Sequence, residues 1–499
     1  MSGWNAGYVT DIPYIPGYYR QQSPAHLDLV ARLAGATFRL PEDFVWIELG
    51  CGVGYGAAMV AAANPDARVI GIDFNPAHIA EGQLLAAEAG LDNLTFLEAD
   101  LATLAESPLL ASIPVADVVT MHGVWSWVSD TVRAGIVRFF DARVRPGGLV
   151  HLSYNALPTW QGALAYQRIV HEAGKRLAVR SDQQAMEGVG VALALRDAKA
   201  QHLTGEMSSA LMDRARSMPP AYLAHEYMNG AWRPVFFADV AQALAGAKLE
   251  FAGSALPLEQ FPDLIMSEAQ REIYERFDDP AMRETVKDVC LGRALRQDVF
   301  IRGLNRLGRR DRDAALFDLS LGLAVPLDDF AYEAEMPAGH ASFSPDFYRP
   351  IAAALSERPH TVRELLALPD AKGRKDNPSE VAGVLVGTEQ AIPMRRPGAA
   401  QTRQAAALND ALAQRLSRPG LMGMGFALCS HAIGGGMPGM PGELHALRIA
   451  QAGDGAEAIQ SWVERINPDG DAAQRTAMAE TFAKLLAERP PFWRRMGVL

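Results

Sequence analysis

The early part of the chain, residues 44–155, alternates between two hydrophobic patterns. Apolar runs of strand length recur there, and helical apolar–polar periodicity fills the intervals between them. We predict five strands from these runs, at residues 44–50, 67–73, 93–100, 116–123 and 148–155. Strands that alternate with helices form a parallel sheet covered by helices on both faces. The predicted fold class is therefore α/β, with a Rossmann-like, doubly wound and mostly parallel sheet.

The helices predicted between these strands carry residues that are typical of helix N-termini and C-termini. In the helix over residues 75–90, Pro76 lies just inside the start and Gly90 lies at the end. The helix that follows the fourth strand is expected to be capped by Ser129 and to end at a Pro-Gly-Gly sequence.

Beyond residue 157 the pattern changes twice. Residues 157–223 are rich in alanine with helical spacing and contain no strand-like run, so we interpret them as a helical insertion into the first domain. Alternating strand and helix patterns return in residues 233–257 and 294–304. The two late strands are expected to form an antiparallel pair at one edge of the sheet.

An arginine-rich polar stretch, residues 302–313, marks the expected domain boundary. A solvated linker or helix face is favoured there over a phosphate-binding patch. We predict a first domain over residues 1–310 and a C-terminal domain over residues 314–499. Two short helices around a turn are predicted in residues 345–369, which indicates a winged-helix-like unit. The Gly- and Met-rich residues 421–442 are predicted to be an ordered but irregular loop.

Composition narrows the class of protein. The 499 residues are 49% hydrophobic and 21% charged, which is typical of a soluble globular protein. A net charge of −11 disfavours a dedicated nucleic-acid binder and leaves cationic substrates open. Cys51, Cys290 and Cys429 lie far apart, which excludes a Cys-rich zinc site and is typical of reduced thiols in a cytoplasm. We therefore expect a cytoplasmic protein with no metal, no signal peptide and no membrane span.

A glycine-rich turn follows the first predicted strand, in the sequence "IELGCGVGYG". A strand, a glycine-rich turn and a helix N-terminus together form a nucleotide-binding device, because the backbone can approach the ligand closely. Gly52, Gly54 and Ala57 also satisfy the dinucleotide pattern G-x-G-x-x-G/A. NAD(P) or flavin binding is therefore an alternative to other nucleotide-like ligands at this stage.

Three acidic residues accompany the glycine turn. Glu48 lies two residues before Gly50. Asp73 ends the second predicted strand, where a carboxylate can bind both hydroxyls of a ribose. Asp100 ends the third predicted strand, where it can meet an adenine amino group.

These motifs resemble those of the class I S-adenosylmethionine (SAM)-dependent methyltransferases. The sequence "ELGCGVGYG" is similar to that family's glycine motif, "GIDFNP" to its acidic ribose motif and "EADL" to its adenine-side motif. The resemblance covers residues 40–155 strongly and the later strands weakly. It implies SAM as the cofactor and a methyltransferase activity.

The resemblance also implies roles for individual residues. Gly50, Gly52 and Gly54 would flank the methionine and ribose parts of the cofactor. Asp73 would hold the ribose, and Phe74 would cover the adenine face. The remaining residues expected at the cofactor are Tyr18, Glu48, Asp100, Leu101 and His122.

A narrower resemblance involves the flanking sequences. Segments such as "HGVWSWVSD", "SYNALPTW" and "AYLAHEYMN" are similar to methyltransferases that carry a so-called regulatory domain, and some of those are bacterial protein lysine methyltransferases. The expected partner is a methyl acceptor, either a protein, a peptide or a small molecule. Nucleic acid is not expected, and a homodimer is left open.

The methyl acceptor is expected at the carboxyl ends of the fourth and fifth strands, because ligands of this fold lie at that edge of the sheet. The candidate acceptor residues are His122, Trp125, Trp127, Tyr154 and Asn155. Either tryptophan can instead pack in the core, and His122 can be structural rather than a base. Three tyrosines that precede the first helix are expected to close over the site as a lid: Tyr14, Tyr18 and Tyr19.

A lysine acceptor suits such a pocket. At pH 7 only about one lysine in 10³ is neutral, which corresponds to roughly 4 kcal/mol of deprotonation. A dry aromatic pocket lowers the pKa of an amine by desolvation, and its rings attract cations by about 0.5–2 kcal/mol. We therefore predict methyl transfer to a protein or peptide amine, with lysine as the expected acceptor. The alternatives are a small-molecule N- or O-methyltransferase, a non-catalytic SAM-binding interaction protein and a minor oxidoreductase hypothesis.

Overall fold

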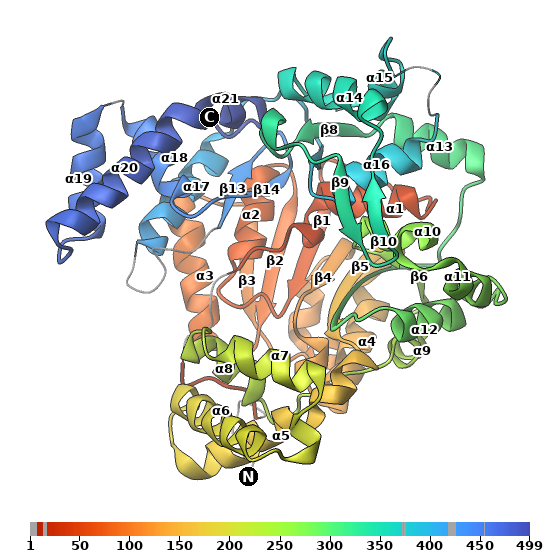
Figure 1. Cartoon of the computed structure of the whole chain (residues 1–499), viewed down its shortest axis with the longest axis vertical. Helices are drawn as coiled ribbons and strands as arrows, with labels where there is room; N and C mark the ends of the chain where they lie inside the picture. Colours follow the sequence, from red (N-terminus) through yellow and green to blue (C-terminus); the bar gives the residue numbers. More distant parts are fainter. Residues whose placement is uncertain (1–6, 13–16, 372, 374–375, 418–425, 454) are drawn as a thin grey trace.

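A seven-stranded sheet forms the centre of the molecule in the computed structural model, which describes all residues except 1–6, 13–16, 372, 374–375, 418–425 and 454 (Figure 1). Its strand order is β3-β2-β1-β4-β5-β7-β6. The strands are β1 (Val45–Leu49), β2 (Arg68–Asp73), β3 (Leu94–Glu98), β4 (Ala116–Met121), β5 (Val144–Asn155), β6 (Leu249–Ser254) and β7 (Leu295–Arg302). The first five strands are mutually parallel, whereas β7 runs antiparallel to both β5 and β6. The predicted α/β fold with a mostly parallel sheet and an antiparallel edge is confirmed.

Alternate residues of each strand face two different helix layers, because successive side chains of a strand point to opposite faces. Trp46 packs with α1 (Pro24–Leu33), α2 (Tyr55–Ala63) and α3 (Pro76–Ala89). Its neighbour Ile47 packs with α4 (Asp130–Arg143) and α9 (Phe237–Ala245) on the other face. The capping prediction for Ser129 is confirmed, because its hydroxyl accepts a hydrogen bond from the Val132 N–H at 3.4 Å.

Four helices between β5 and α9 form a layer of their own at one end of the sheet, opposite the C-terminal helices (Figure 1). They are α5 (Leu164–Leu177), α6 (Ser181–Asp197), α7 (Glu206–Ala215) and α8 (Pro220–Tyr227). Their buried apolar residues form a separate cluster. Val9 also belongs to this cluster and comes from the segment that precedes α1, which we call the leader. The helical layer therefore packs against part of the segment before α1, through Val9.

The chain between β6 and β7 and after β7 adds further helices and small sheets. Three helices lie between the two edge strands: α10 (Pro262–Ile265), α11 (Glu268–Tyr274) and α12 (Pro280–Cys290). A three-stranded sheet of order β11-β8-β12 follows α13 (Arg309–Phe317). Its strands and the associated elements are β8 (Ser320–Leu323), β9 (Glu333–Met336), β10 (Gly339–Ser342), α14 (Pro345–Glu357), β11 (His360–Thr361), α15 (Val362–Leu366), α16 (Pro378–Gly387) and β12 (Ala391–Met394).

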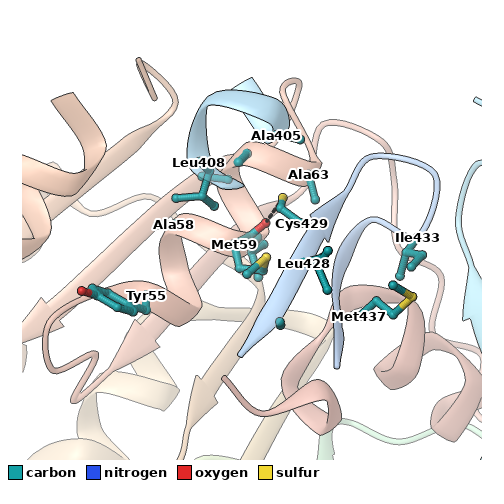
Figure 2. Packing of buried hydrophobic residues seen from close by; sticks show 14 of the residues in the cluster. Tyr55, Ala58, Met59, Ala63, Ala405, Leu408, Leu428, Cys429, Ile433 and Met437 are labelled. Atoms are coloured by element: carbon teal, nitrogen blue, oxygen red, sulfur yellow. Dashed lines mark hydrogen bonds between the residues drawn. The ribbon is translucent and has the colours of Figure 1, made fainter. Parts of the chain in front are cut away.

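The last part of the chain packs directly on the helices of the large sheet. It consists of α17 (Arg403–Leu416), β13 (Ala427–Ser430), β14 (Gly435–Pro438), α18 (Glu443–Ala452), α19 (Ala456–Ile466), α20 (Ala472–Glu488) and α21 (Pro490–Arg495). Helix α17 and the β13–β14 hairpin share one apolar core with α2 and α3 (Figure 2). In this core Leu408 and Leu428 are fully buried beside Met59.

The irregular loop predicted for residues 421–442 is wrong for residues 427–438. This stretch forms the antiparallel hairpin β13–β14, and Cys429 is buried against α2, where its thiol donates to the Met59 carbonyl. Residues 421–425 lie outside the described part of the chain. Each strand has only four residues, and glycines fill the turn, so the period-two pattern was too short to predict a strand.

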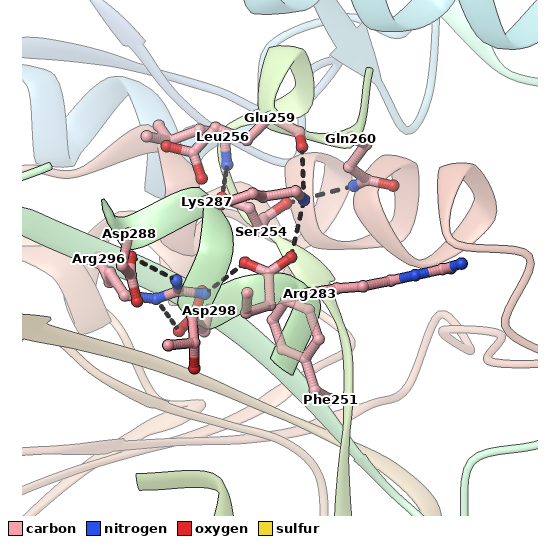
Figure 3. Close-up of polar contacts among 12 residues, drawn as sticks. Phe251, Ser254, Leu256, Glu259, Gln260, Arg283, Lys287, Asp288, Arg296 and Asp298 are labelled. Atoms are coloured by element: carbon pink, nitrogen blue, oxygen red, sulfur yellow. Dashed lines mark hydrogen bonds and ion pairs between the residues drawn. The ribbon is translucent and has the colours of Figure 1, made fainter. Parts of the chain in front are cut away.

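A buried network of charged side chains fixes α12 to β7 and β5 (Figure 3). The Arg296 guanidinium has no solvent exposure and forms ion pairs with Asp298, Asp288 and Glu284 at 2.8–2.9 Å. Tyr154 donates a hydrogen bond to the Asp298 carboxylate at 2.5 Å. Because each charge is desolvated, the network depends on every partner being in place.

Within the described ranges, none of the helices combines the length and the apolar character needed to cross a membrane.

Replacement of Arg296 by methionine removes the cation from this network and leaves three buried carboxylates without it. We expect Arg296→Met to lower the free energy of unfolding by about 3–5 kcal/mol, measured by urea denaturation. The exposed Arg310→Met serves as the control and should change it by less than about 0.5 kcal/mol. Equal stability of the two variants would contradict a structural role for the network.

Candidate active site

A cavity of about 480 Å³ opens at the carboxyl ends of β1, β2, β3 and β4. Its walls come from the leader, the glycine turn after β1, and the segments that follow the other three strands. Eleven of the residues predicted from the sequence line it: Tyr18, Tyr19, Glu48, Gly50, Gly52, Asp73, Phe74, Asp100, Leu101, His122 and Trp127. Four predicted residues do not line it: Gly54, Trp125, Tyr154 and Asn155.

The glycine turn brings the backbone to the edge of the cavity. Gly52 has a φ of 53°, and a Cβ at this position would point into open space. Gly54 has a φ of 79°, and a Cβ there would lie 2.3 Å from the Phe96 ring. Gly52 therefore leaves room for a ligand, whereas Gly54 lets the turn and α2 pack against β3.

Asp73 links the end of β2 to the glycine turn. Its carboxylate accepts hydrogen bonds from the Gly52 N–H and the Asn75 N–H, both at 2.9 Å, and it lies 3.3 Å from Nδ1 of His78. The next residue, Phe74, meets the ring of Tyr8 edge to face at 5.8 Å. A rigid carboxylate and an aromatic wall thus lie side by side at this end of the cavity.

Asp100 and Leu101 form the wall that follows β3. The Asp100 carboxylate is exposed and accepts a hydrogen bond from the Ala102 N–H at 2.8 Å, while Leu101 is buried. The carboxylate is therefore held by its own turn and remains accessible.

Glu48 lies beneath the glycine turn as a buried carboxyl group. Burial raises its pKa to about 8, although the Ala57 N–H at the start of α2 opposes this shift. In the described structure its Oε2 has no hydrogen-bond partner, and the same holds for Nε1 of Trp46 and Oγ1 of Thr120, which also line the cavity. Buried polar atoms usually have hydrogen-bond partners, so these three atoms are available to form hydrogen bonds with a polar ligand.

His122 follows β4 and contacts the leader. The Tyr19 ring stacks on its imidazole with ring centroids 3.6 Å apart. Burial lowers the pKa of His122 to about 4, so the imidazole is neutral at pH 7. A neutral ring can accept a hydrogen bond, but it is a weak base.

The two tryptophans after His122 have different surroundings. They belong to the 3-10 helix η4 (Trp125–Trp127) rather than to a strand end. Trp125 packs in the core beneath α4, whereas Trp127 lines the cavity and faces Trp232 at a centroid distance of 6.2 Å. A 3-10 turn separates these residues because side chains two apart on it diverge.

The end of β5 is placed behind the cavity wall. Tyr154 belongs to the buried charge network described above. The Asn155 N–H donates to the Ser126 hydroxyl at 2.8 Å, and its side-chain oxygen accepts from Nε1 of Trp232 at 3.3 Å. Both residues therefore have structural partners, and the structure does not bring them to the cavity surface.

The leader supplies part of the cavity wall, and the sequence predicted only some of its residues there. Tyr18 and Tyr19 line the cavity, whereas Tyr14 lies outside the described residues. The hydroxyl of Tyr18 accepts a hydrogen bond from the Gly436 N–H of β14 at 2.7 Å. Tyr8 and Trp46 also line the cavity and were not predicted. Trp46 lies two residues before Glu48, so strand periodicity could have indicated it.

Comparison with known proteins identifies the family. Residues 47–150 match the family model described as "Methyltransferase domain", and residues 219–302 match the one described as "Predicted methyltransferase regulatory domain". The uncharacterized protein sll1526 from Synechocystis is 32% identical over 372 residues, which is 74% of this chain and 73% of that protein. The chain belongs to the class I SAM-dependent methyltransferases.

The structure of PKMT2 from Rickettsia typhi is similar to this methyltransferase over its whole length. It is 18% identical, with a TM-score of 0.70, and the match covers 98% of this chain and 100% of that one. The structure of PKMT2 in complex with AdoHcy is 16% identical with the same TM-score and the same coverage. At this identity the similarity demonstrates a shared fold.

The cofactor of the methyltransferase is SAM, and the cavity residues fit it. When bound, SAM supplies a methyl group on a sulfonium, next to an ammonium and a ribose. The open space at Gly52 and the carboxylates of Glu48 and Asp73 match a ligand with positive charge and hydroxyl donors. The unpartnered Oε2 of Glu48 is the most direct indication of such a ligand.

Removal of the Asp73 carboxylate should weaken cofactor binding. We expect Asp73→Ala to raise the Kd for SAM and S-adenosylhomocysteine at least tenfold in isothermal titration, because charge-assisted hydrogen bonds contribute about 1.5–3 kcal/mol. The exposed Asp66→Ala is the matched control and should bind as the wild type does. Unchanged affinity of Asp73→Ala would contradict its place in the cofactor site.

The raised pKa of Glu48 predicts that SAM binding releases a proton between about pH 4.5 and 8. A nearby cation favours the ionised carboxylate, so the pKa falls on binding and the affinity rises with pH through this window. Titration in buffers of different ionisation enthalpy measures the proton count. SAM's own amine also titrates, so the test is the difference between the wild type and Glu48→Gln. An identical pH slope in both proteins would exclude this linkage.

Proposed function

We propose that this methyltransferase transfers the methyl group of SAM to a side-chain amine of a protein or peptide, with lysine as the acceptor. The observation that carries the proposal is the chemistry of the cavity wall. Its aromatic residues include Tyr8, Tyr19 and Trp127, and no described lining residue is lysine or arginine. An aromatic wall without basic side chains attracts a cationic amine and offers no positive charge to an anionic acceptor.

The same wall suits the chemistry of an amine. Methyl transfer is a displacement at carbon, so holding the amine in line with the methyl group supplies much of the acceleration. The amine must first lose a proton, and an aromatic, poorly solvated site lowers its pKa. The neutral imidazole of His122, stacked on Tyr19, can orient the amine by accepting a hydrogen bond.

The roles of the cofactor residues form part of the proposal. The bonds of Asp73 to Gly52 and Asn75 support a ribose-binding carboxylate, and the edge contact of Phe74 with Tyr8 supports an aromatic cover for the adenine. The accessible carboxylate of Asp100 supports contact with the adenine edge. The fold shared with PKMT2 across the whole chain supports a protein acceptor, since the helical layer and the C-terminal part are included in the match.

We also propose how the C-terminal part of the chain is organised. The order α14, β11, α15, α16 and β12 supports a winged-helix-like unit, and the division into residues 1–310 and 314–499 follows the start of this part of the chain. The helical insertion over residues 157–223 would then shape the acceptor side of the site.

The acceptor can be identified with SAM that carries a labelled methyl group. We expect the enzyme to label proteins in an extract, and hydrolysis should release methylated lysine. Trp127→Ala should raise KM for the acceptor about tenfold, because it removes an aromatic wall, while the Kd for SAM changes little.

Trp127→Phe keeps an aromatic ring and is the matched control, so it should retain most of the acceptor affinity. Label found only in small metabolites would replace the proposal with a small-molecule methyltransferase. Label in methyl esters or ethers would exclude an amine acceptor.

A further inference from the structure

Five residues of the leader form one wall of the cavity, which we call the leader wall: Gly17, Tyr18, Tyr19, Gln22 and Ser23. The short 3-10 helix η1 (Arg20–Gln22) lies within this wall. The Gln22 N–H donates a hydrogen bond to the Tyr19 carbonyl at 3.0 Å. The Ser23 N–H donates to the Arg20 carbonyl at 2.9 Å. Because the backbone is tied in this turn, a displacement of Tyr18 also displaces Gln22.

Gln22 presents a polar atom to the cavity. The residue is only 6% exposed, and within the described ranges its side-chain oxygen Oε1 has no hydrogen-bond partner. A buried amide oxygen without a partner is costly, so a ligand that donates a hydrogen bond to it is stabilised. SAM carries such donors in its ammonium and its ribose hydroxyls. The leader wall therefore offers the cofactor a contact in addition to those of Glu48 and Asp73.

Strand β14 contacts the leader wall through two glycines. The Gly436 N–H donates to the Tyr18 hydroxyl at 2.7 Å. A Cβ at Gly436 would lie 2.8 Å from two carbons of the Tyr18 ring and from Cβ of Ala427. A Cβ at Gly435 would lie 3.1 Å from both the Tyr18 hydroxyl oxygen and Cβ of Ser23. Only glycine allows the strand to approach the wall so closely, and this approach determines where the wall lies.

The β13–β14 hairpin is itself attached to α2 at both ends of that helix (Figure 2). At the start of α2, Tyr55 lines the cavity and meets the ring of Phe426 edge to face at 5.7 Å. At the other end, Nδ2 of Asn64 donates to the Gly434 carbonyl at 3.0 Å. Because α2 starts at the glycine turn, the hairpin holds the leader wall at a fixed place relative to that turn.

We infer that Gln22 of the leader wall binds SAM and that the β13–β14 hairpin positions this wall, with Gly435 as the positioning residue. The inference concerns the cofactor and holds for any methyl acceptor, so it does not depend on the proposed function. Because the hairpin determines the geometry of the binding site, SAM binding and the attachment of the hairpin to the leader stabilise each other. The C-terminal part of the chain thereby contributes to the affinity for the cofactor.

Isothermal titration of S-adenosylhomocysteine tests the contact at Gln22 without an acceptor. Gln22→Met removes the amide oxygen at similar side-chain volume. The Kd should rise about tenfold, because a buried hydrogen bond to the ligand is lost. Gln183→Met, at an exposed position of α6, is the matched control and should bind as the wild type does. An unchanged Kd in Gln22→Met would overturn the inference.

Substitutions of Gly435 test the positioning by the hairpin. The three atoms nearest to a Cβ at Gly435 all belong to Tyr18 and Ser23 of the leader wall, so a side chain there displaces the wall. The Kd for S-adenosylhomocysteine should rise about threefold in Gly435→Ala and about tenfold or more in Gly435→Val. Unchanged affinity in Gly435→Val would mean that the hairpin only fills the core, and would overturn the inference.

A destabilised variant with an intact cavity is the control for these substitutions. In Gly383→Ala of α16 the new Cβ would lie 2.4 Å from the ring of Phe261, and neither residue lines the cavity. We expect a lower Tm, while the Kd for S-adenosylhomocysteine stays within about twofold of the wild-type value. A loss of affinity in Gly383→Ala equal to that in Gly435→Val would overturn the role of Gly435.

Hydrogen exchange of the wild type tests the linkage even where Gly435→Val fails to fold. The Gly436 amide is bonded to Tyr18, so its exchange reports on the contact between hairpin and leader wall. Saturation with S-adenosylhomocysteine should slow exchange of the β13–β14 amides about fivefold or more. The β9–β10 hairpin, whose residues do not line the cavity, is the matched control and should exchange equally with and without ligand. Equal exchange of β13–β14 in both states would overturn the inference.

Discussion

Three successive backbone amides of the glycine turn are bonded to the end of β2, and the rest of the site depends on this attachment. The Gly50 and Cys51 N–H groups donate to the Ile72 carbonyl, and the Gly52 N–H donates to the Asp73 carboxylate. These bonds hold the carboxyl ends of β1 and β2 at a fixed separation. A strand end, a turn and a carboxylate thereby form one rigid edge, on which a cofactor can be positioned without movement of the backbone.

The other walls of the cavity come from distant parts of the chain, and each is supported by an element behind it. Tyr18 is held by Gly436, 418 residues away, so the C-terminal hairpin determines where part of the leader lies. The hairpin itself shares a core with α2, the helix that starts at the glycine turn (Figure 2). On the opposite side α8 faces Tyr8 through His225. The C-terminal hairpin and α8 thus both support segments that line the cavity.

Residues at the end of β5 show why sequence position alone does not define a pocket. Tyr154 and Asn155 end a strand that points toward the site, yet their side chains bond Asp298 and Trp232. The antiparallel partner β7 carries Arg296 opposite Tyr154, and the charge network draws that side chain to the α12 side. Trp125 and Trp127 are separated by a 3-10 turn, which no periodicity in so short a segment could predict.

The sequence by itself determined the parallel sheet, the glycine turn and the acidic residues at the ends of β1, β2 and β3. These features are local, because hydrophobic period, glycine spacing and strand ends are set by neighbouring residues. Only the tertiary structure decided which aromatic residues reach the cavity, that the Gly-rich stretch after α17 is a hairpin, and that the C-terminal hairpin holds Tyr18 of the segment before α1. The physical reason is that these contacts join segments hundreds of residues apart, and their side chains are selected by packing between elements.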